Sequence, residues 1–341
     1  MTYEEIMNEI TEGLTGDPEV DLEYLKAQME KYKEHEQSQE IIRACGRLIY
    51  NLMPDDAKEE LGKIMNREDL KIDAIMDEIH FAIYEKKIDK AVSLITELAN
   101  KADELHMYEN DSVSEYYCFE STMEELLYKI INNPEREVRA SQYPYARVYL
   151  EQGSVYFEAG MYDEAEKALE KARRWNPVNI RIASEYMETI KMRKDWDAFK
   201  NITLEMFKYA FKREDVARLF RNLGFYFVEI QDYVAAKLCY TLSLNYESDN
   251  KNAMSELYYI DDLTKGQYKL PSEDEAEKIA EKYGFPMGVN PDVLGIAFAL
   301  GKQCLEEGQV DGIRYFMSIV YDLTRDDEIK KILDSLPEIE D

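Results

Sequence analysis

Apolar residues recur along nearly the whole chain with the spacing of one face of an α-helix. Intervals of three or four residues separate them, as in the run Leu22, Leu25, Met29 and Tyr32. No segment shows the sustained alternation of apolar and polar residues that marks a half-buried strand. With 14 glycines and 9 prolines in 341 residues, the chain also offers few turns for a many-stranded fold. This spacing predicts an all-α protein.

The helical pattern also repeats, at a period of about 34 residues. Residues 146–179 read Tyr-x3-Gly-x2-Tyr and then, after a turn, Ala-x3-Leu-x2-Ala with a closing proline. The residues at these positions are Tyr149, Gly153, Tyr156, Ala165, Leu169, Ala172 and Pro177. Residues 217–250 repeat the pattern around Gly224, which follows Gly153 by 71 residues. A small residue in each helix of such a pair lets the two backbones approach closely.

This pattern resembles the tetratricopeptide repeat, and the resemblance implies a right-handed superhelix of antiparallel helix pairs. Residues 180–216 fit a degenerate copy of the repeat, and weaker copies lie at 72–105 and 294–327. We therefore expect three parts along the chain. They are an N-terminal helical cap or subdomain over 1–70, a solenoid over 71–260, and a linker helix with a last repeat and a capping helix over 261–341.

The composition is strongly acidic and narrows the range of partners. The chain carries 42 Lys and Arg against 71 Asp and Glu, a net charge of −29. Nucleic acid is not an expected partner, because a phosphate backbone recruits clustered Lys and Arg. Residues 141–221 are a near-neutral island, with 15 basic and 13 acidic side chains. The acidic start and the absence of a long apolar segment predict a cytoplasmic protein that neither enters nor binds a membrane.

No motif of a known catalytic or cofactor site occurs in the sequence. HExxH, GxSxG, GxGxxG and the P-loop pattern are all absent, and the four cysteines are scattered without metal-ligand spacing. The cysteines are therefore interpreted as buried thiols that pack as small hydrophobes. We expect a protein without enzymatic activity, cofactor or metal.

The resemblance also indicates where a ligand would bind, because in this family the first helix of each pair lines the concave groove. The same helical offset in three successive repeats gives Arg147, Arg181 and Arg218, and Arg221 follows one turn later. Arginine suits the capture of a carboxylate or phosphate through its planar fork. The remaining groove candidates are Leu150, Ser154, Phe157, Asn222 and Phe225. The alternative is that the arginines pair internally with carboxylates such as Glu151, Glu185 and Glu229.

Three functions are compatible with this pattern. The first is a protein–protein interaction scaffold that binds a peptide or protein segment, with an anionic group as one option, in the groove of its repeats. The second is an intracellular peptide-sensing regulator whose superhelix changes shape when a short peptide binds. The third is a chaperone-like holdase, which would need an exposed apolar patch. The sequence predicts neither the partner nor the oligomeric state.

Overall fold

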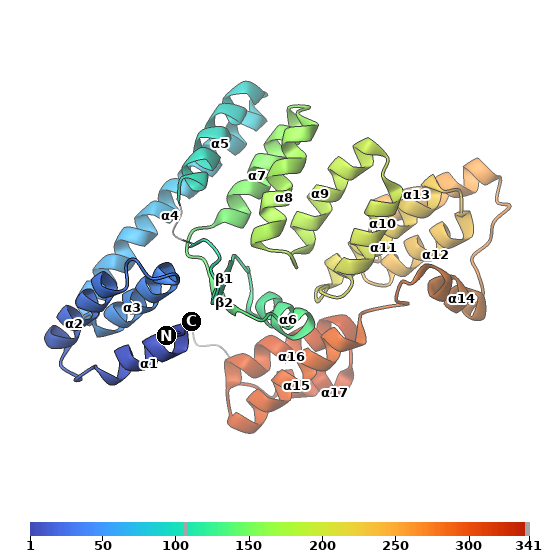
Figure 1. Ribbon diagram of the computed structural model, residues 1–341. Coiled ribbons are helices and arrows are strands. Elements are labelled where there is room, and N and C mark those ends of the chain that lie inside the picture. Colours follow the sequence, from blue (N-terminus) through green and yellow to red (C-terminus); the bar gives the residue numbers. More distant parts are fainter. Residues whose placement is uncertain (106–107, 338–341) are drawn as a thin grey trace. The chain divides into compact units, whose positions relative to one another are not determined.

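The computed structural model describes residues 1–105 and 108–337, with the backbone alone at residue 55 and residues 59–70 (Figure 1). Helices dominate these residues, so the predicted all-α fold is confirmed. Contacts group the chain into two compact units. Unit 1 comprises Met1–Cys118 and Pro134–Ala159, and unit 2 comprises Phe119–Asn133 and Gly160–Asp341.

Unit 1 holds six helices and both strands among its described residues. They are α1 (Tyr3–Glu12), α2 (Pro18–Lys31), α3 (Ser38–Leu52), α4 (Asp55–Tyr84), α5 (Ile88–Asp103), α7 (Tyr145–Glu158), β1 (Ser114–Tyr117) and β2 (Glu137–Ala140). The first three helices share a small core that includes Ile6, Ile10, Leu25 and Ile41. The chain turns sharply into α2 because Asp17 caps the helix and Pro18 fixes its first position.

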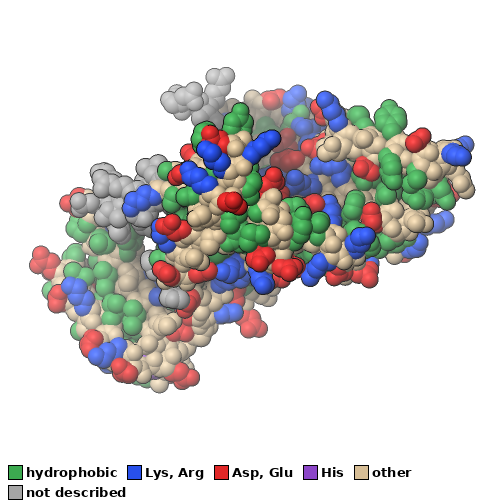
Figure 2. Space-filling view, turned by 90° about the horizontal axis from the view of Figure 1, so that it is seen from above, with side chains coloured by type: hydrophobic (Ala, Val, Ile, Leu, Met, Phe, Trp, Pro, Cys, Tyr) green, Lys and Arg blue, Asp and Glu red, His purple; other side chains and the backbone are tan. Residues whose placement is uncertain are grey.

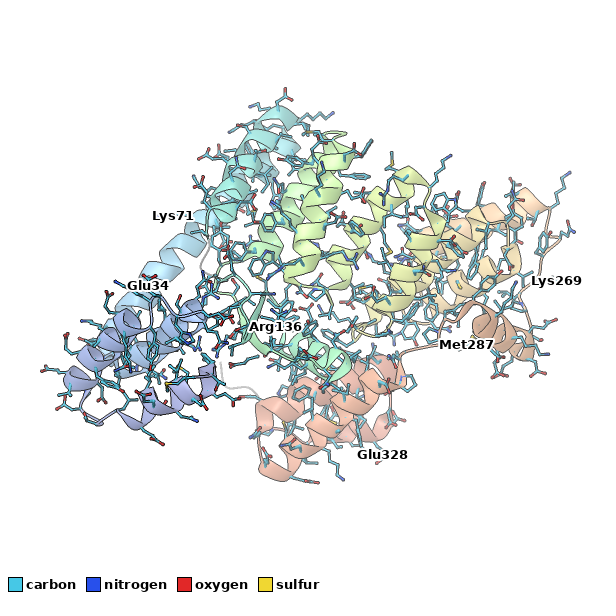
Figure 3. The ribbon with its side chains drawn as sticks, viewed as in Figure 1. Glu34, Lys71, Arg136, Lys269, Met287 and Glu328 are labelled. Atoms are coloured by element: carbon cyan, nitrogen blue, oxygen red, sulfur yellow. The ribbon has the colours of Figure 1, made fainter. Side chains whose placement is uncertain are left out.

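The two strands are a feature that the sequence pattern does not predict. They pair in parallel, with Ser114 opposite Glu137 and Tyr117 opposite Ala140. Each strand has only four residues, and all four side chains of β1 are buried, so no alternation marks it. Arg136, labelled in Figure 3, precedes β2 and forms an ion pair with Glu115 of β1.

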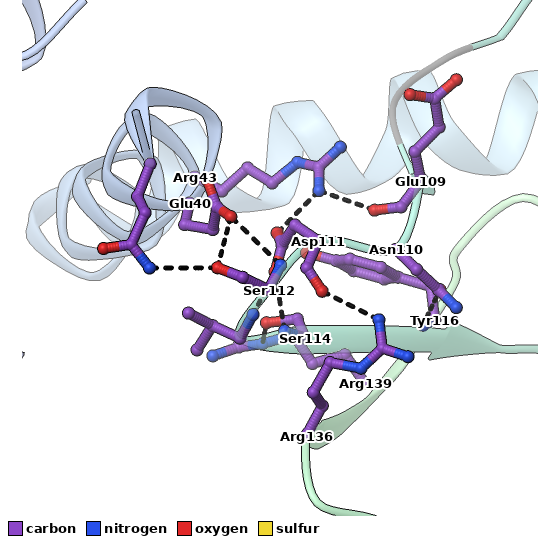
Figure 4. Close-up of polar contacts among 12 residues, drawn as sticks. Glu40, Arg43, Glu109, Asn110, Asp111, Ser112, Ser114, Tyr116, Arg136 and Arg139 are labelled. Carbon is purple, nitrogen blue, oxygen red and sulfur yellow. Dashed lines mark hydrogen bonds and ion pairs between the residues drawn. The ribbon is translucent and has the colours of Figure 1, made fainter. Parts of the chain in front are cut away.

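The segment before β1 is attached to α3 by a polar cluster (Figure 4). Arg43 donates to the carbonyl of Glu109 and pairs with the Asp111 carboxylate at 2.8 Å. Glu40 accepts hydrogen bonds from both the backbone N–H and the hydroxyl of Ser112. These bonds fix the loop within unit 1, so its polar residues serve the fold rather than an open site.

Unit 2 contains the remaining helices of the described chain. They are α6 (Thr122–Asn132), α8 (Tyr162–Trp175), α9 (Ile180–Arg193), α10 (Trp196–Met206), α11 (Arg213–Glu229), α12 (Tyr233–Leu244), α13 (Lys251–Thr264), α14 (Glu273–Tyr283), α15 (Pro291–Glu307), α16 (Val310–Thr324) and α17 (Asp327–Asp334). Consecutive helices pack against each other as pairs, notably α9 with α10, α11 with α12, and α15 with α16. The segments predicted as repeats at 180–216, 217–250 and 294–327 thus each contain a packed pair of helices.

One small residue of the repeat pattern, Gly224, packs directly against the second helix of its pair. Gly224 of α11 is buried against the ring of Tyr240 on α12, and Ala236 beside it is fully buried. Leu223 and Phe227 of the same helix are also buried, at 1% and 0% exposed. The predicted repeat over 217–250 thus has a buried glycine in contact with the second helix.

The predicted domain boundaries are not settled by the arrangement of the helices and stay a prediction. The boundary expected between residues 70 and 71 falls inside α4, which runs unbroken from Asp55 to Tyr84. The expected last repeat corresponds to α15 and α16. The helix that follows, α17, packs against α16 and buries Ile329.

Candidate ligand-binding site

Basic and acidic side chains are interspersed on the face that Figure 2 displays, with hydrophobic side chains between them. Charge alone therefore does not single out a binding surface there. A more specific feature lies within unit 2, where a cavity of about 450 Å³ is open to solvent. Its walls come from the start of α6, the start of α9, the first half of α11 and Glu247, which follows α12. We call it cavity A.

Cavity A contains three of the four arginines that are predicted to line the groove. Arg181 projects from the first turn of α9, and Arg218 and Arg221 lie one turn apart on α11. Arg221 forms an ion pair with Glu247 and is largely buried. Across the described residues, Arg181 and Arg218 form no ion pair. Two guanidinium groups in this cavity are thus available to a ligand.

The groove candidates on α7 belong to unit 1 and do not line cavity A. Arg147 is exposed and forms an ion pair with Asp73 of α4. Leu150 is 5% exposed and therefore packs inside the fold, while the Ser154 hydroxyl donates to the Leu150 carbonyl at 3.0 Å. Phe157 is half-buried near the end of the same helix.

The last two candidates, Asn222 and Phe225, are half-buried on α11 but do not line cavity A. The Phe225 ring packs between aromatic rings of α10, with its centroid 5.7 Å from those of both Trp196 and Phe199. The ammonium of Lys191 lies 4.6 Å from the same centroid. This packing gives Phe225 a structural contact between neighbouring helices.

Internal pairing of the arginines, the alternative to ligand binding, occurs for two of them with carboxylates other than those expected. Arg147 pairs with Asp73, and Arg221 pairs with Glu247. Glu151 instead contacts His80, with 2.9 Å between the Glu151 oxygen and Nε2. Ion pairs within the protein therefore occupy Arg147 and Arg221, whereas neither Arg181 nor Arg218 forms an ion pair among the described residues.

A buried carboxylate of α6 fixes one wall of cavity A. Glu124 is 6% exposed and accepts hydrogen bonds from the side-chain amides of Asn176 and Asn179 at 2.8 and 2.9 Å. It also accepts one from the backbone N–H of Glu120 at 2.7 Å. Burial raises the pKa of Glu124, although these hydrogen bonds oppose the rise. Sequence reasoning missed this residue because α6 lies outside every repeat.

A second carboxylate of cavity A is Asp215, in the first turn of α11. Burial raises the pKa of Asp215 to about 6, and the negative charges of Glu214 and Glu124 add to the rise. The positive charges of Lys212 and Arg218 oppose it. Asp215 therefore carries less negative charge near neutral pH than an exposed aspartate would.

We predict that Asp215→Asn stabilises the protein near neutral pH. The pKa of Asp215 is about 6 in the folded chain and about 4 in an unfolded one, so protonation favours folding. That stabilisation is fully present below about pH 4 and is lost as the pH rises through about 6. Asparagine cannot ionise, so the variant should exceed the wild type by about 1–2 kcal/mol at pH 7.5.

Thermal unfolding at a series of pH values between 4 and 7.5 measures this difference. The gap between Asp215→Asn and the wild type should widen as the pH rises. Glu214→Gln, which removes an exposed carboxylate from the same helical turn, is the matched control. A gap that stays constant across the series would contradict the prediction.

The remaining chemical groups give no sign of another kind of site. Among the side chains that the structure describes, no group of three or more His, Cys, Asp or Glu residues is arranged to hold a metal ion. Cys45, Cys239 and Cys304 are buried free thiols, and Cys118 is half-buried. Among the described helices, none combines the length and the apolar character that crossing a membrane requires.

Comparison with known proteins identifies one segment of the chain. Residues 146–177, which span α7 and α8, match the family model described as the tetratricopeptide repeat. No curated protein matches the chain. Repeats of this family are protein-interaction modules and typically lack catalytic activity. The match agrees with the pattern of Tyr149, Gly153, Ala165 and Pro177, and it supports a tetratricopeptide repeat over this segment of the chain.

Proposed function

We propose that the protein is a non-catalytic scaffold that binds a peptide or protein segment, and that cavity A receives an acidic group of that ligand. The observation that carries the proposal is the pair of guanidinium groups of Arg181 and Arg218, which line one cavity and form no ion pair among the described residues. Planar guanidinium groups bind a carboxylate through two parallel hydrogen bonds. An acidic side chain or a chain terminus would supply that carboxylate.

The carboxylates around the two arginines favour a peptide over a simple anion. Glu247 is neutralised by Arg221, and burial raises the pKa values of Glu124 and Asp215. The other carboxylates that line cavity A, those of Glu120, Glu185 and Glu214, would repel an isolated phosphate. They can instead accept the backbone N–H groups of a peptide, because an ionised carboxylate is a strong acceptor.

A peptide selection tests this proposal. A random library of twelve-residue peptides is selected on the wild-type protein, and the affinities of the enriched peptides are then measured by calorimetry. We expect the enriched peptides to contain Asp or Glu, and Arg181→Gln with Arg218→Gln to weaken binding at least about tenfold, which corresponds to about 1.4 kcal/mol.

Arg193→Gln is the matched control, because Arg193 lies at the far end of α9 and pairs with Glu166. It should leave the affinity unchanged. Arg221 is left intact in the test, since its replacement would leave Glu247 without its ion-pair partner. Peptides that lack acidic residues, or that bind the double variant as well as the wild type, would overturn the proposal.

The wider groove that includes Arg147, Leu150, Ser154, Phe157, Asn222 and Phe225 remains a prediction, as does the cytoplasmic location. A regulator that changes shape on binding remains the alternative function. The radius of gyration, measured by X-ray scattering with and without a selected peptide, distinguishes the two functions. A regulator would become more compact, whereas a passive scaffold would keep its dimensions.

A further inference from the structure

A second cavity in unit 2 shares a wall with cavity A. It has a volume of about 730 Å³ and lies between the start of α11, the residue Ser121 before α6, and one face of α16. We call it cavity B. Phe211, Lys212 and Glu214 line both cavities, so the short segment that leads into α11 separates them. A ligand that crosses this segment would reach both.

The dividing segment is held firmly by Arg213. Its guanidinium donates to the carbonyls of Asn245 and Tyr246 after α12, at 2.7 and 3.1 Å, and to that of Asp322 on α16 at 3.0 Å. One side chain thus connects the start of α11 to the ends of two other helices. These hydrogen bonds hold the segment between the two cavities in place. Because they use the guanidinium of Arg213, this side chain is not expected to bind the ligand.

Two further charged residues of cavity B have partners within the protein. Arg314 donates to the carbonyl of Pro337 at 2.5 Å, and the Asp322 carboxylate pairs with Arg325 at 3.1 Å. Beside the charged side chains of Lys212, Glu214 and Asp311, cavity B offers a ligand apolar surface from Phe211, Tyr315 and Ile319. The Tyr315 hydroxyl accepts a hydrogen bond from the backbone N–H of Met123, which holds the ring in place.

Cavity A offers guanidinium groups and cavity B offers apolar side chains, so a ligand that fills both needs one acidic and one apolar group. We propose that cavities A and B are two subsites of one binding site for an extended peptide, with an acidic side chain at Arg181 and Arg218 and an apolar side chain against Tyr315 and Ile319. The peptide backbone crosses between them over Lys212 and Glu214. This inference rests on the proposed function, since it assumes that cavity A receives the acidic group.

Linked and unlinked probes test whether the two subsites act together. The unlinked probes are acetyl-Asp-amide and acetyl-Leu-amide. The linked probes are acetyl-Leu-(Gly)n-Asp-amide and acetyl-Asp-(Gly)n-Leu-amide, with n varied from zero to six. Ligand-detected NMR titration gives their affinities. Joining two fragments that bind adjacent subsites raises the affinity only when the linker spans the distance between them.

We expect a linked probe with one particular spacer length to bind at least about tenfold more tightly than acetyl-Asp-amide does. Ile319→Ser should remove that gain and leave acetyl-Asp-amide unaffected. Leu305→Ser, which replaces a 46% exposed leucine of α15 outside both cavities, is the matched control and should keep the gain. Circular dichroism confirms that each variant is folded.

Two results would overturn the inference while the proposed function stands. One is that acetyl-Asp-amide binding depends on Arg181 and Arg218 but no spacer length improves on it. The other is that the gain persists in a folded Ile319→Ser variant. Binding that does not depend on the two arginines would overturn both proposals. Because spacer dependence is measured on the wild type, it decides the question even if Ile319→Ser unfolds.

Discussion

The substitution Gly224→Leu is expected to destabilise unit 2 by about 3 kcal/mol or more. A Cβ atom at this position would lie 2.8 Å from two ring carbons of Tyr240 and 2.9 Å from a third. Tyr240 is only 3% exposed and packs in the interface between α11 and α12, so its ring has little room to move. A leucine would therefore separate the two helices of this repeat.

Urea unfolding, followed by circular dichroism at 222 nm, measures this loss. Gly295→Leu on α15 is the matched control, because a Cβ there meets no heavy atom within 4 Å and the residue is exposed. That control should be neutral or slightly stabilising, since leucine favours a helix more than glycine does. Equal unfolding midpoints for the two variants would mean that α11 and α12 do not pack through Gly224.

The position of Gly224 shows what the sequence could predict. Helices and their close contacts within a pair depend on residues a few positions apart, and the repeat pattern records them. The capping box of α14, in which Ser272 and Glu275 exchange hydrogen bonds, is equally local. The strands β1 and β2 escaped prediction because four residues are too few to show a period.

The candidate site was less predictable, for a physical reason. Helical offset identifies residues that share a face, and Arg181 and Arg218, which it groups, both line cavity A. It does not reveal which helices outside the repeats form the other walls of a cavity. Cavity A needs the start of α6 and cavity B needs α16, and both reach their places through contacts between residues far apart in sequence. The two asparagines that donate to Glu124 lie in the segment between α8 and α9, so helical offset does not predict their contact with α6.

The substitution Glu124→Ala is expected to cost about 2–4 kcal/mol of folding free energy. The carboxylate accepts two side-chain amide donors and one backbone donor, and it is nearly inaccessible to solvent. Its removal would leave the buried amides of Asn176 and Asn179 without this acceptor. Asn179 also caps α9 by accepting from the backbone N–H of Ile182, so its displacement would loosen the start of that helix.

Glu125→Ala is the matched control, because the neighbouring carboxylate is half-buried and pairs with Lys129 on the same helix. That loss should stay within about 0.5 kcal/mol. Hydrogen exchange of the α6 amides localises the effect, and it should rise in Glu124→Ala but not in the control. Equal losses for the two variants would show that these hydrogen bonds do not hold α6. Both cavities would then lose a defined wall, because Glu124 lines cavity A and Ser121 lines cavity B.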